Sequence, residues 1–290
     1  CPGPYWPTVL AATAIERAGS DAQKKRWLSA VATGDARATI ALLDGDLDWN
    51  PEAMTARAEK SGSGFTLSGT NQFVPWAHVA NVLLVPPKTT DGLTLFLVDP
   101  AAAGLTLEPA PVMDLATRLT TVTLDRVAVP ADGVLGGPGQ AGPLLAELLR
   151  RGAVGAAAEM LGAARRCLDM AVEYAKVREQ FGQPIGSFQA IRHKCADMLL
   201  EVENSHSAVY YAAWALDAKA EDAALAASVA KAYVGDAARK VCGEAIQVHG
   251  GIGFTWEYDL HLYFKRAKAL EPLYGDGDYH RELILRAVAG

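Results

Sequence analysis

Two stretches of the sequence combine residue types that could hold a charged or planar ligand. The first, residues 178–189, reads Arg-Glu-Gln-Phe-Gly-Gln-Pro-Ile-Gly-Ser-Phe-Gln. It places the guanidinium of Arg178 near the aromatic ring of Phe181, and guanidinium groups pair well with phosphates. Gly182 and Pro184 predict a turn between two helices. The side chains of Arg178 and Phe181 should therefore be exposed at a helix end.

The second stretch, residues 247–255, reads Gln-Val-His-Gly-Gly-Ile-Gly-Phe-Thr. Glycines allow a ligand to approach the backbone closely, because no side chain stands in the way. Both stretches also have an ordinary structural interpretation, which spacing alone favours: Gly182 and Pro184 end one helix, and Gly250 caps another. His249 either caps its helix end or touches a cofactor.

The elements that position these stretches follow from the proline distribution. Twelve of the fifteen prolines lie in residues 1–140, and proline breaks helix interiors. The second half can therefore form long helices, whereas the first cannot. Three long helices and a short one are predicted to form an up-down bundle: 144–177, 187–217, 221–249 and about 278–287.

The first half changes character after its beginning. Residues 8–17 and 21–31 predict two short helices, with Ser20 as an N-cap. From about residue 37 the hydrophobic period becomes two, and turn residues separate the segments. The pattern indicates a small antiparallel β-domain, either a barrel or a sandwich. Its expected strands are 36–43, 64–68, 79–85, 93–98 and 119–129.

Composition places the chain among ordinary globular proteins. It has 290 residues, 50% hydrophobic and 21% charged, with a net charge of −6, which fits one to three domains. Since no basic block exists, nucleic acid is not expected as a main partner. No uninterrupted apolar run reaches about 18 residues, so no membrane span is expected.

The four cysteines are Cys1, Cys167, Cys195 and Cys242. None has the spacing of a metal hook, and the histidines show no ligand spacing either, so no metal site is predicted. We interpret the cysteines as reduced, buried residues, and no secretory signal is visible. A cytoplasmic location is therefore expected.

In this order and at this separation, the two stretches resemble the acyl-CoA dehydrogenase family. Residues 19–28 resemble that family's helix before the β-domain, and residues 126–142 resemble its crossover into the C-terminal bundle. The resemblance covers essentially the whole chain and implies a mainly α fold with a β-domain, although most of the family's N-terminal helical domain is absent. The implied parts are a remnant of the N-terminal helical domain at 1–35, a β-domain (barrel or sandwich) at 36–135 and a C-terminal up-down four-helix bundle at 141–290.

The resemblance also implies a cofactor and a reaction. The family oxidises an acyl-CoA thioester between Cα and Cβ with FAD, while a glutamate takes the α-proton. Its RxQFG and QxxGGxG stretches bind the ADP half of a flavin whose ring lies in the neighbouring subunit. By this resemblance Arg178 pairs with the pyrophosphate, Gln180 donates a hydrogen bond, and Phe181 packs against the adenosine or the flavin stem. Three residues of the second stretch approach the pyrophosphate and ribose: Gln247, Gly250 and Gly251.

The residues expected around the flavin ring depart from the family pattern. The family's TEP-like loop presents a threonine hydroxyl, but residues 41–46 place Leu43 at that position. The family's W-I-T-N strand presents a second threonine, and Pro75 stands in its place. Neither Leu43 nor Pro75 offers a hydroxyl, and proline has no backbone N–H.

The catalytic base is also missing. The family glutamate stands in a Y-E-G-T stretch, which aligns Tyr274 or Gly275 with the glutamate and Asp276 with the threonine. Some members carry the glutamate on the first long bundle helix instead, where this chain has Gly152. Glu147 lies more than one turn from Gly152 and is a weak substitute. Tyr274 is a candidate to fill the space that the glutamate has left.

These departures favour a base-lacking subunit of a hetero-oligomeric, FAD-dependent acyl-CoA dehydrogenase. Such a chain lends its ADP-binding residues to FAD held mainly by a second, dehydrogenase-like subunit, which supplies the glutamate and the ring contacts. The expected assembly is α2β2, with an acyl-CoA substrate and a flavoprotein as electron acceptor. It is similar to paired subunits that handle bulky thioesters, including steroid side chains.

Two alternatives remain open on the sequence. In the first, the chain is a self-sufficient homo-oligomeric flavoenzyme that uses Asp276 or Asp278 as its base. In the second, it is a structural paralogue that binds no flavin, although the intact Arg178 and Gln247 stretches argue against this. Bound FAD in the purified chain, alone and with a partner, separates the three.

Overall fold

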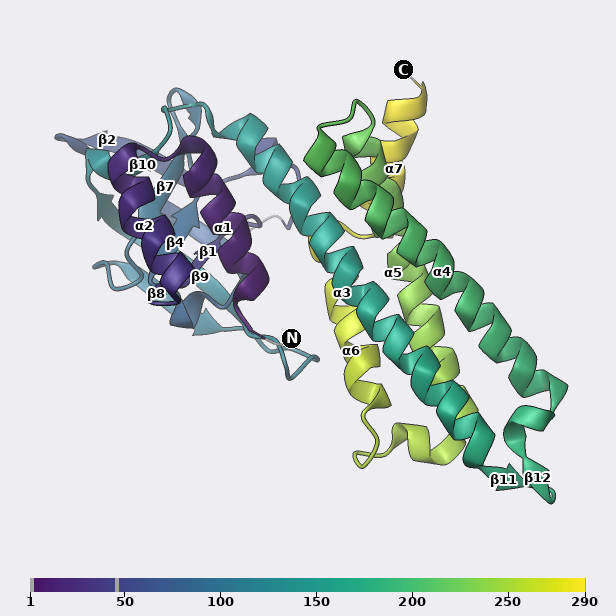
Figure 1. Cartoon of the computed structure of the whole chain (residues 1–290). Coiled ribbons are helices and arrows are strands. Elements are labelled where there is room, and N and C mark those ends of the chain that lie inside the picture. Colours follow the sequence, from purple (N-terminus) through teal and green to yellow (C-terminus); the bar gives the residue numbers. More distant parts are fainter. Residues whose placement is uncertain (1–2, 45–46, 290) are drawn as a thin grey trace. The chain divides into compact units, whose positions relative to one another are not determined.

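The computed structural model describes residues 3–44 and 47–289. The chain divides into two compact units, residues 1–149 and 150–290 (Figure 1). Each has a hydrophobic cluster of its own, built from strand side chains in the first unit and helix side chains in the second. Within the described ranges, no helix is both long and apolar enough to cross a membrane.

Two helices open the first unit, α1 (Tyr5–Ala18) and α2 (Asp21–Thr33). They contain both helices predicted there. Ser20 caps α2 as expected: its Oγ accepts from the backbone N–H of Gln23, and the Gln23 side chain accepts from the Ser20 N–H at 2.9 Å. This reciprocal pair satisfies two donors that a helix start otherwise leaves open.

The rest of the first unit is a pair of packed sheets. Phe65 of one sheet meets Phe96 of the other edge to face, with ring centroids 5.1 Å apart, so the β-domain is a sandwich. One sheet has four strands in the order β1 (Ala38–Ile40), β4 (Val82–Val85), β7 (Leu95–Val98) and β10 (Val134–Leu135). The other has six, in the order β6 (Gly92–Leu93), β5 (Lys88–Thr89), β2 (Arg57–Ser61), β3 (Gly64–Pro75), β9 (Leu119–Val129) and β8 (Leu105–Pro109).

The sheets differ from the prediction in two respects. β1–β4 and β2–β5 are parallel pairs, so the β-domain is mixed rather than wholly antiparallel. A tight turn forces an antiparallel pair, but neither of these pairs is joined by one. The sequence also missed β2, β8 and the two-residue strands β5 and β10. Strand β2 buries a single side chain and gives little signal, whereas β8 has alternating leucines that pack against the core, so its signal was present.

The helices of the second half confirm the predicted up-down bundle. The long helices are α3 (Ala141–Val177), α4 (Gln189–Ala218) and α5 (Ala223–His249), and the chain's last helix is α7 (Gly277–Ala289). A further helix, α6 (Leu260–Leu270), was not predicted, so the expectation of four helices was incomplete. It is a short amphipathic helix whose buried residues, Leu260, Ala267 and Leu270, have helical spacing, so a signal for it was present in the sequence.

The cysteines follow the prediction in part. Cys167 and Cys242 are buried free thiols, whereas Cys195 is only partly buried. Cys1 lies outside the described residues. Cys167 lies on α3 and Cys242 on α5, and a hydrogen bond joins their thiols. These two small residues therefore serve the packing of α3 against α5.

Candidate functional site

The Arg178 stretch forms a tight hairpin at the end of α3. Strands β11 (Glu179–Gln180) and β12 (Gln183–Pro184) pair antiparallel across a two-residue turn (Figure 1). Phe181 and Gly182 form this turn with φ values of 56° and 78°. Two successive positive φ values are typical of hairpin turns whose twist matches their strands.

The hairpin presents its polar and aromatic groups outward. The side chain of Phe181 is 92% exposed, although its ring edge meets Phe188 with centroids 6.1 Å apart. The guanidinium of Arg178 is exposed and forms no ion pair or hydrogen bond with any residue that the structure describes. Gln180 is exposed as well, and its amide donates to the carbonyl of Glu179 at 2.8 Å. Arg178 therefore has its full donor capacity available.

The second stretch forms the end of α5 and the turn after it. Gly250 caps the helix with φ 65° and ψ −140°, a conformation that requires glycine. Gly251 has no such requirement, because its φ is not left-handed and a β-carbon there would meet no atom within 4 Å. The open space over Gly251 can admit a ligand that approaches the backbone. Gln247 is exposed one turn before it.

A stack of rings packs the end of α3, just before the first stretch, against the second stretch. His249 is 4% exposed, and its ring lies on that of Tyr174 with centroids 4.3 Å apart; Tyr258 covers it at 4.9 Å. The Nδ1 of His249 is 2.8 Å from the carbonyl oxygen of Ala245. Because a carbonyl only accepts, Nδ1 carries the proton. Burial lowers the pKa of His249, against the effect of this hydrogen bond, so the ring is held neutral.

The stack fixes the two predicted stretches at one end of the bundle, because Tyr174 lies one turn before Arg178 and His249 adjoins Gly250. Of the alternatives for His249, the structure shows a packed side chain bonded within its own helix. Its Nε2 is buried and has no hydrogen-bond partner among the described residues. Sequence reasoning did not predict the contact with Tyr174.

The segments expected at the flavin ring lie in the first unit. Leu43 is buried, and its carbonyl accepts from the N–H of Gln72 at 2.9 Å. Pro75 ends β3, and its carbonyl accepts from the hydroxyl of Thr39 at 2.7 Å. Gly45 and Asp46 of the same loop lie outside the described residues. At both predicted positions the side chain is apolar.

The next residue, Asp44, has a structural role. It is 2% exposed, and one carboxylate oxygen accepts from the N–H and hydroxyl of Thr55 and from the N–H of Ala56. These bonds use the carboxylate to hold the loop against the chain that enters β2. Asp44 is thus committed to the fold.

The two alternative positions for the catalytic base lie in contact. Tyr274 is 5% exposed, and a β-carbon built on Gly152 would stand 2.6 Å from Cδ1 of its ring. Such a distance is too short for any side chain at Gly152, so the ring occupies the space over the bare glycine. Burial raises the pKa of the Tyr274 phenol, and the charge of Glu159 adds to the shift. Neither position carries a carboxylate.

Gly275, the other residue aligned with the base, is also closed. It has a φ of 98°, and a β-carbon there would stand 2.3 Å from Cδ1 of Tyr279. A glutamate at Gly275 would therefore need both the backbone and Tyr279 to move. Glu147, the weak substitute, lies 3.8 Å from the guanidinium of Arg17.

The two aspartates proposed as replacement bases lie at the start of α7. Asp276 accepts from the backbone N–H of Tyr279 at 2.8 Å, as an N-terminal capping residue does. Asp278 is 94% exposed at its side chain and pairs with Arg281 at 3.0 Å. Both carboxylates thus have structural roles at a helix terminus.

A buried amine that sequence reasoning missed lies beneath this turn. Lys231 of α5 is 1% exposed, and its Nζ donates to the carbonyls of Glu271 and Gly275 at 2.6 and 2.7 Å. Burial lowers its pKa to about 8, against the opposing charges of Glu271 and Asp276. One lysine in an alanine-rich helix gives no signal that distinguishes it from an exposed one.

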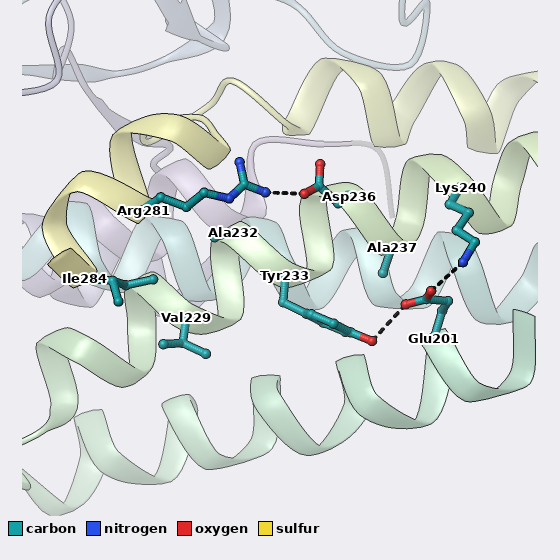
Figure 2. A pocket seen from close by; sticks show the side chains of 9 residues that line it. All are labelled: Glu201, Val229, Ala232, Tyr233, Asp236, Ala237, Lys240, Arg281 and Ile284. Atoms are coloured by element: carbon teal, nitrogen blue, oxygen red, sulfur yellow. Dashed lines mark hydrogen bonds and ion pairs between the residues drawn. The ribbon is translucent and has the colours of Figure 1, made fainter. Parts of the chain in front are cut away.

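The bundle also has a surface groove of about 420 Å³ along α5 (Figure 2). Its charged groups are already paired: Glu201 accepts from Tyr233 at 2.8 Å and from Lys240 at 2.7 Å, and Asp236 pairs with Arg281. None of the predicted site residues lines it. The groove therefore offers paired charges beside apolar side chains and lies apart from the predicted site residues.

The comparisons with known proteins bear on this geometry. The family model described as "Acyl-CoA dehydrogenase, C-terminal domain" matches residues 143–289. This chain belongs to the acyl-CoA dehydrogenase family. It is 38% identical to acyl-CoA dehydrogenase FadE34 of Mycobacterium tuberculosis, over 100% of this chain and 36% of that protein. The chain thus spans about a third of that relative.

Three solved structures of the acyl-CoA dehydrogenase fold are similar to the chain. The ChsE4-ChsE5 complex of Mycobacterium tuberculosis gives a TM-score of 0.91 at 30% identity, covering 100% of this chain and 76% of that one. The Tcur3481-Tcur3483 steroid ACAD G363A variant gives 0.89 at 34%, covering 100% and 77%. A glutaryl-CoA dehydrogenase of Mycobacterium smegmatis in complex with FADH2 gives 0.90 at 28%, covering 96% and 72%. They confirm the predicted family and fold class.

FAD is the cofactor of this family, and the second unit has groups that fit its ADP half. The unpaired guanidinium of Arg178, the exposed ring of Phe181 and the open backbone at Gly251 suit a pyrophosphate with an adjoining planar group. The glycine at 251 is itself informative, because nothing within the described chain requires it. The fit concerns the nucleotide half alone, since Leu43 and Pro75 bring no hydroxyl group.

Proposed function

We propose that this chain is a base-lacking subunit of a hetero-oligomeric, FAD-dependent acyl-CoA dehydrogenase. It contributes the ADP-half contacts to a flavin held mainly by a second acyl-CoA dehydrogenase-like subunit, which carries the catalytic glutamate. The reaction is α,β-desaturation of an acyl-CoA thioester. When bound, FAD supplies a two-electron acceptor for that oxidation.

One contrast carries this proposal: the guanidinium of Arg178 is unpaired within the described chain and the backbone at Gly251 is open, whereas the expected base positions are closed. Arg178 has no partner within the described chain, and Gly251 leaves open space over its backbone. Gly152 and Tyr274, by contrast, leave no room for a carboxylate between them. A chain with this pattern can hold a nucleotide without abstracting the α-proton.

Each of the six nucleotide-facing residues has a proposed role. Arg178 neutralises the pyrophosphate, and a charged hydrogen bond of this kind contributes about 1.5–3 kcal/mol. Gln180 donates to the cofactor, and Phe181 packs on the adenosine or the flavin stem. The other three residues approach the pyrophosphate and ribose: Gln247, Gly250 and Gly251.

The partner subunit supplies what this chain lacks, namely the glutamate and the hydroxyl contacts to the flavin ring. Support for a paired assembly comes from the similarity to the ChsE4-ChsE5 complex and to the Tcur3481-Tcur3483 steroid ACAD. We infer an α2β2 arrangement, an electron-accepting flavoprotein and a bulky substrate of the steroid side-chain class. The proposed cellular location of the protein is the cytoplasm.

The two alternative functions have weaker support. A homo-oligomeric enzyme needs Asp276 or Asp278 as its base, but the first caps α7 and the second pairs with Arg281. A paralogue that binds no flavin leaves the glycine at 251 and the unpaired Arg178 without a purpose. The base-lacking subunit accounts for both observations.

Two substitutions test the proposal in the assembled enzyme. The chain is co-expressed with a glutamate-carrying acyl-CoA dehydrogenase subunit of the same organism, and FAD affinity is measured by titration of the apo-complex. Arg178→Ala is expected to weaken FAD binding about 10- to 100-fold, from the loss of one charged contact. Gly251→Ala is expected to weaken it as well while leaving the stability of the chain unchanged.

Matched controls lie on α3. Arg165, which pairs with Glu203 at 2.7 Å, is changed to alanine, and so is Gly162, where a β-carbon also meets nothing. Both controls should bind FAD as the unsubstituted complex does. An unchanged FAD affinity in both Arg178→Ala and Gly251→Ala would refute the proposed nucleotide contacts.

A further inference from the structure

The turn between α6 and α7 is fastened to the bundle from its buried side. Lys231 donates to the carbonyls of Glu271 and Gly275, which are the two flanks of the turn. Lys231 is 1% exposed, and these bonds place its amine directly beneath the backbone of the turn. A buried charge is costly unless it is hydrogen-bonded, so the turn and the amine depend on one another.

A second buried group, the imidazole of His280, holds Tyr274, which lies between Glu271 and Gly275. His280 of α7 is 4% exposed, and its Nε2 is 3.0 Å from the carbonyl oxygen of Tyr274. Because the carbonyl accepts, Nε2 carries the proton and donates it. Burial, with the charge of Lys231, lowers the pKa of His280 to about 4, so the ring donates as a neutral imidazole at neutral pH.

The backbone held in this way is unusual. Tyr274 and Gly275 have φ values of 60° and 98°, and a left-handed conformation at a bulky residue costs about 1–2 kcal/mol. The hydrogen bonds from Lys231 and His280 reach three carbonyls of the turn. They offset that strain and fix the direction in which the Tyr274 side chain leaves the backbone, which is toward α3 and Gly152.

We propose that Lys231 and His280 are positioning residues that hold the Tyr274 ring over Gly152, where the ring closes the base position of this chain to an acyl thioester. What this means for the substrate rests on the proposed function, under which only the site that contains the partner's glutamate performs chemistry. The base position of this chain is then filled by the Tyr274 ring as well as inactive, and the acyl group is directed to the partner's glutamate.

Several charged groups surround the turn, and its Glu271 also pairs with Lys268 at 2.7 Å and with Arg239 at 3.7 Å. Glu271 and Asp276 face Lys231 with opposite charge, and the same Asp276 acts on His280. Glu159 of α3 faces the Tyr274 phenol. The amine of Lys231 donates directly to the turn backbone, and replacing Lys231 by methionine removes these two contacts while keeping an aliphatic side chain of similar length.

Ionisation of the Tyr274 phenol reports the position of its ring. The absorbance of tyrosinate is followed against pH in the full chain, and the curve of the same chain carrying Tyr274→Phe is subtracted from it, so that the difference belongs to Tyr274. The unsubstituted chain should show no ionisation near pH 10, the ordinary pKa of tyrosine. In Lys231→Met the difference should move down toward this value. Lys240→Met, an exposed position on the same helix, should behave as the unsubstituted chain.

Butyryl-CoA serves as the probe thioester. In large molar excess over the chain, it should leave the Tyr274 titration of the unsubstituted chain unchanged, because the position is filled. A shift on adding butyryl-CoA, or a folded Lys231→Met chain whose Tyr274 still fails to ionise, would overturn the proposal. If Lys231→Met does not fold, His280→Phe removes one hydrogen bond and is judged by the same criterion. None of these readouts needs flavin or a second subunit, so their failure is distinct from failure of the nucleotide contacts.

Discussion

The aromatic ring of Tyr274 lies over the bare backbone of Gly152, so close that a β-carbon at Gly152 would stand 2.6 Å from the ring. These residues are far apart in sequence, and each aligns with a place where family members carry the catalytic glutamate. Two alternative bases that serve one substrate carbon must lie near each other. Their contact here supports that alignment, and the Tyr274 ring fills the space over Gly152.

The contact predicts a steric coupling between the two residues. Gly152→Ala should lower the free energy of unfolding by about 1–3 kcal/mol through overpacking, and Tyr274→Ala by about 3–5 kcal/mol through cavity formation. In the Tyr274→Ala background, Gly152→Ala should cost much less, because the ring is gone and alanine favours the helix. Urea denaturation of the four chains measures the coupling.

Gly162 provides the control for that cycle. It lies on the same helix, but a β-carbon there meets no atom within 4 Å. Gly162→Ala should therefore be neutral or stabilising by up to about 1 kcal/mol. Equal costs of Gly152→Ala with and without the Tyr274 ring would show that the two residues are not in contact.

The buried amine of Lys231 predicts a pH dependence of stability at alkaline pH. Its pKa falls from 10.5 to about 8 in the folded chain. Between these values the unfolded chain binds a proton that the native chain has lost, so stability rises with pH in this window. The rise is about 3 kcal/mol, at 1.36 kcal/mol for each unit of pKa. The difference between the unsubstituted chain and Lys231→Met, from denaturation at several pH values, should show it; a flat difference from pH 8 to 10.5 would contradict it.

His280 predicts a pH dependence of the same sign in an acidic window. Its pKa falls from 6.5 to about 4, so the unfolded chain takes up a proton below pH 6.5 that the native chain does not bind. Stability from this group is complete above pH 6.5 and is lost by about 3 kcal/mol as pH falls to 4. His280→Gln should remove this part of the acid sensitivity, whereas His193→Gln at an exposed position should retain it.

The sequence predicted the bundle better than the β-domain. Apolar periodicity and the proline distribution located α3, α4 and α5 within a few residues, and β9 coincides with its predicted bounds of 119–129. Strand β2 buries a single side chain and gives no period, whereas helix α6 and strand β8 are short segments whose apolar spacing was present but not used. The parallel pairing of β1 with β4 depends on long-range packing, which no local pattern encodes.

The candidate site divides in the same way. The hairpin at Arg178 and the glycine turn at Gly250 are local features, and their residue types indicated exposure at helix ends. The ring stack of Tyr174 on His249 and the bonds from Lys231 to the turn arise only when separate helices pack. A buried lysine and an exposed one look alike in an alanine-rich helix, so its role had to come from the structure.

Flavin stoichiometry separates the roles of the two subunits, because we propose that this chain contributes the nucleotide contacts and that another subunit contributes the ring contacts and the base. We predict that the chain purified alone contains no FAD and does not desaturate an acyl-CoA. Joined to its glutamate-carrying partner, it should give one FAD for each pair of subunits, and Arg178→Ala should lower that content. A solitary chain that binds FAD fully and oxidises an acyl-CoA, or a partner that holds FAD equally well without this chain, would contradict the account.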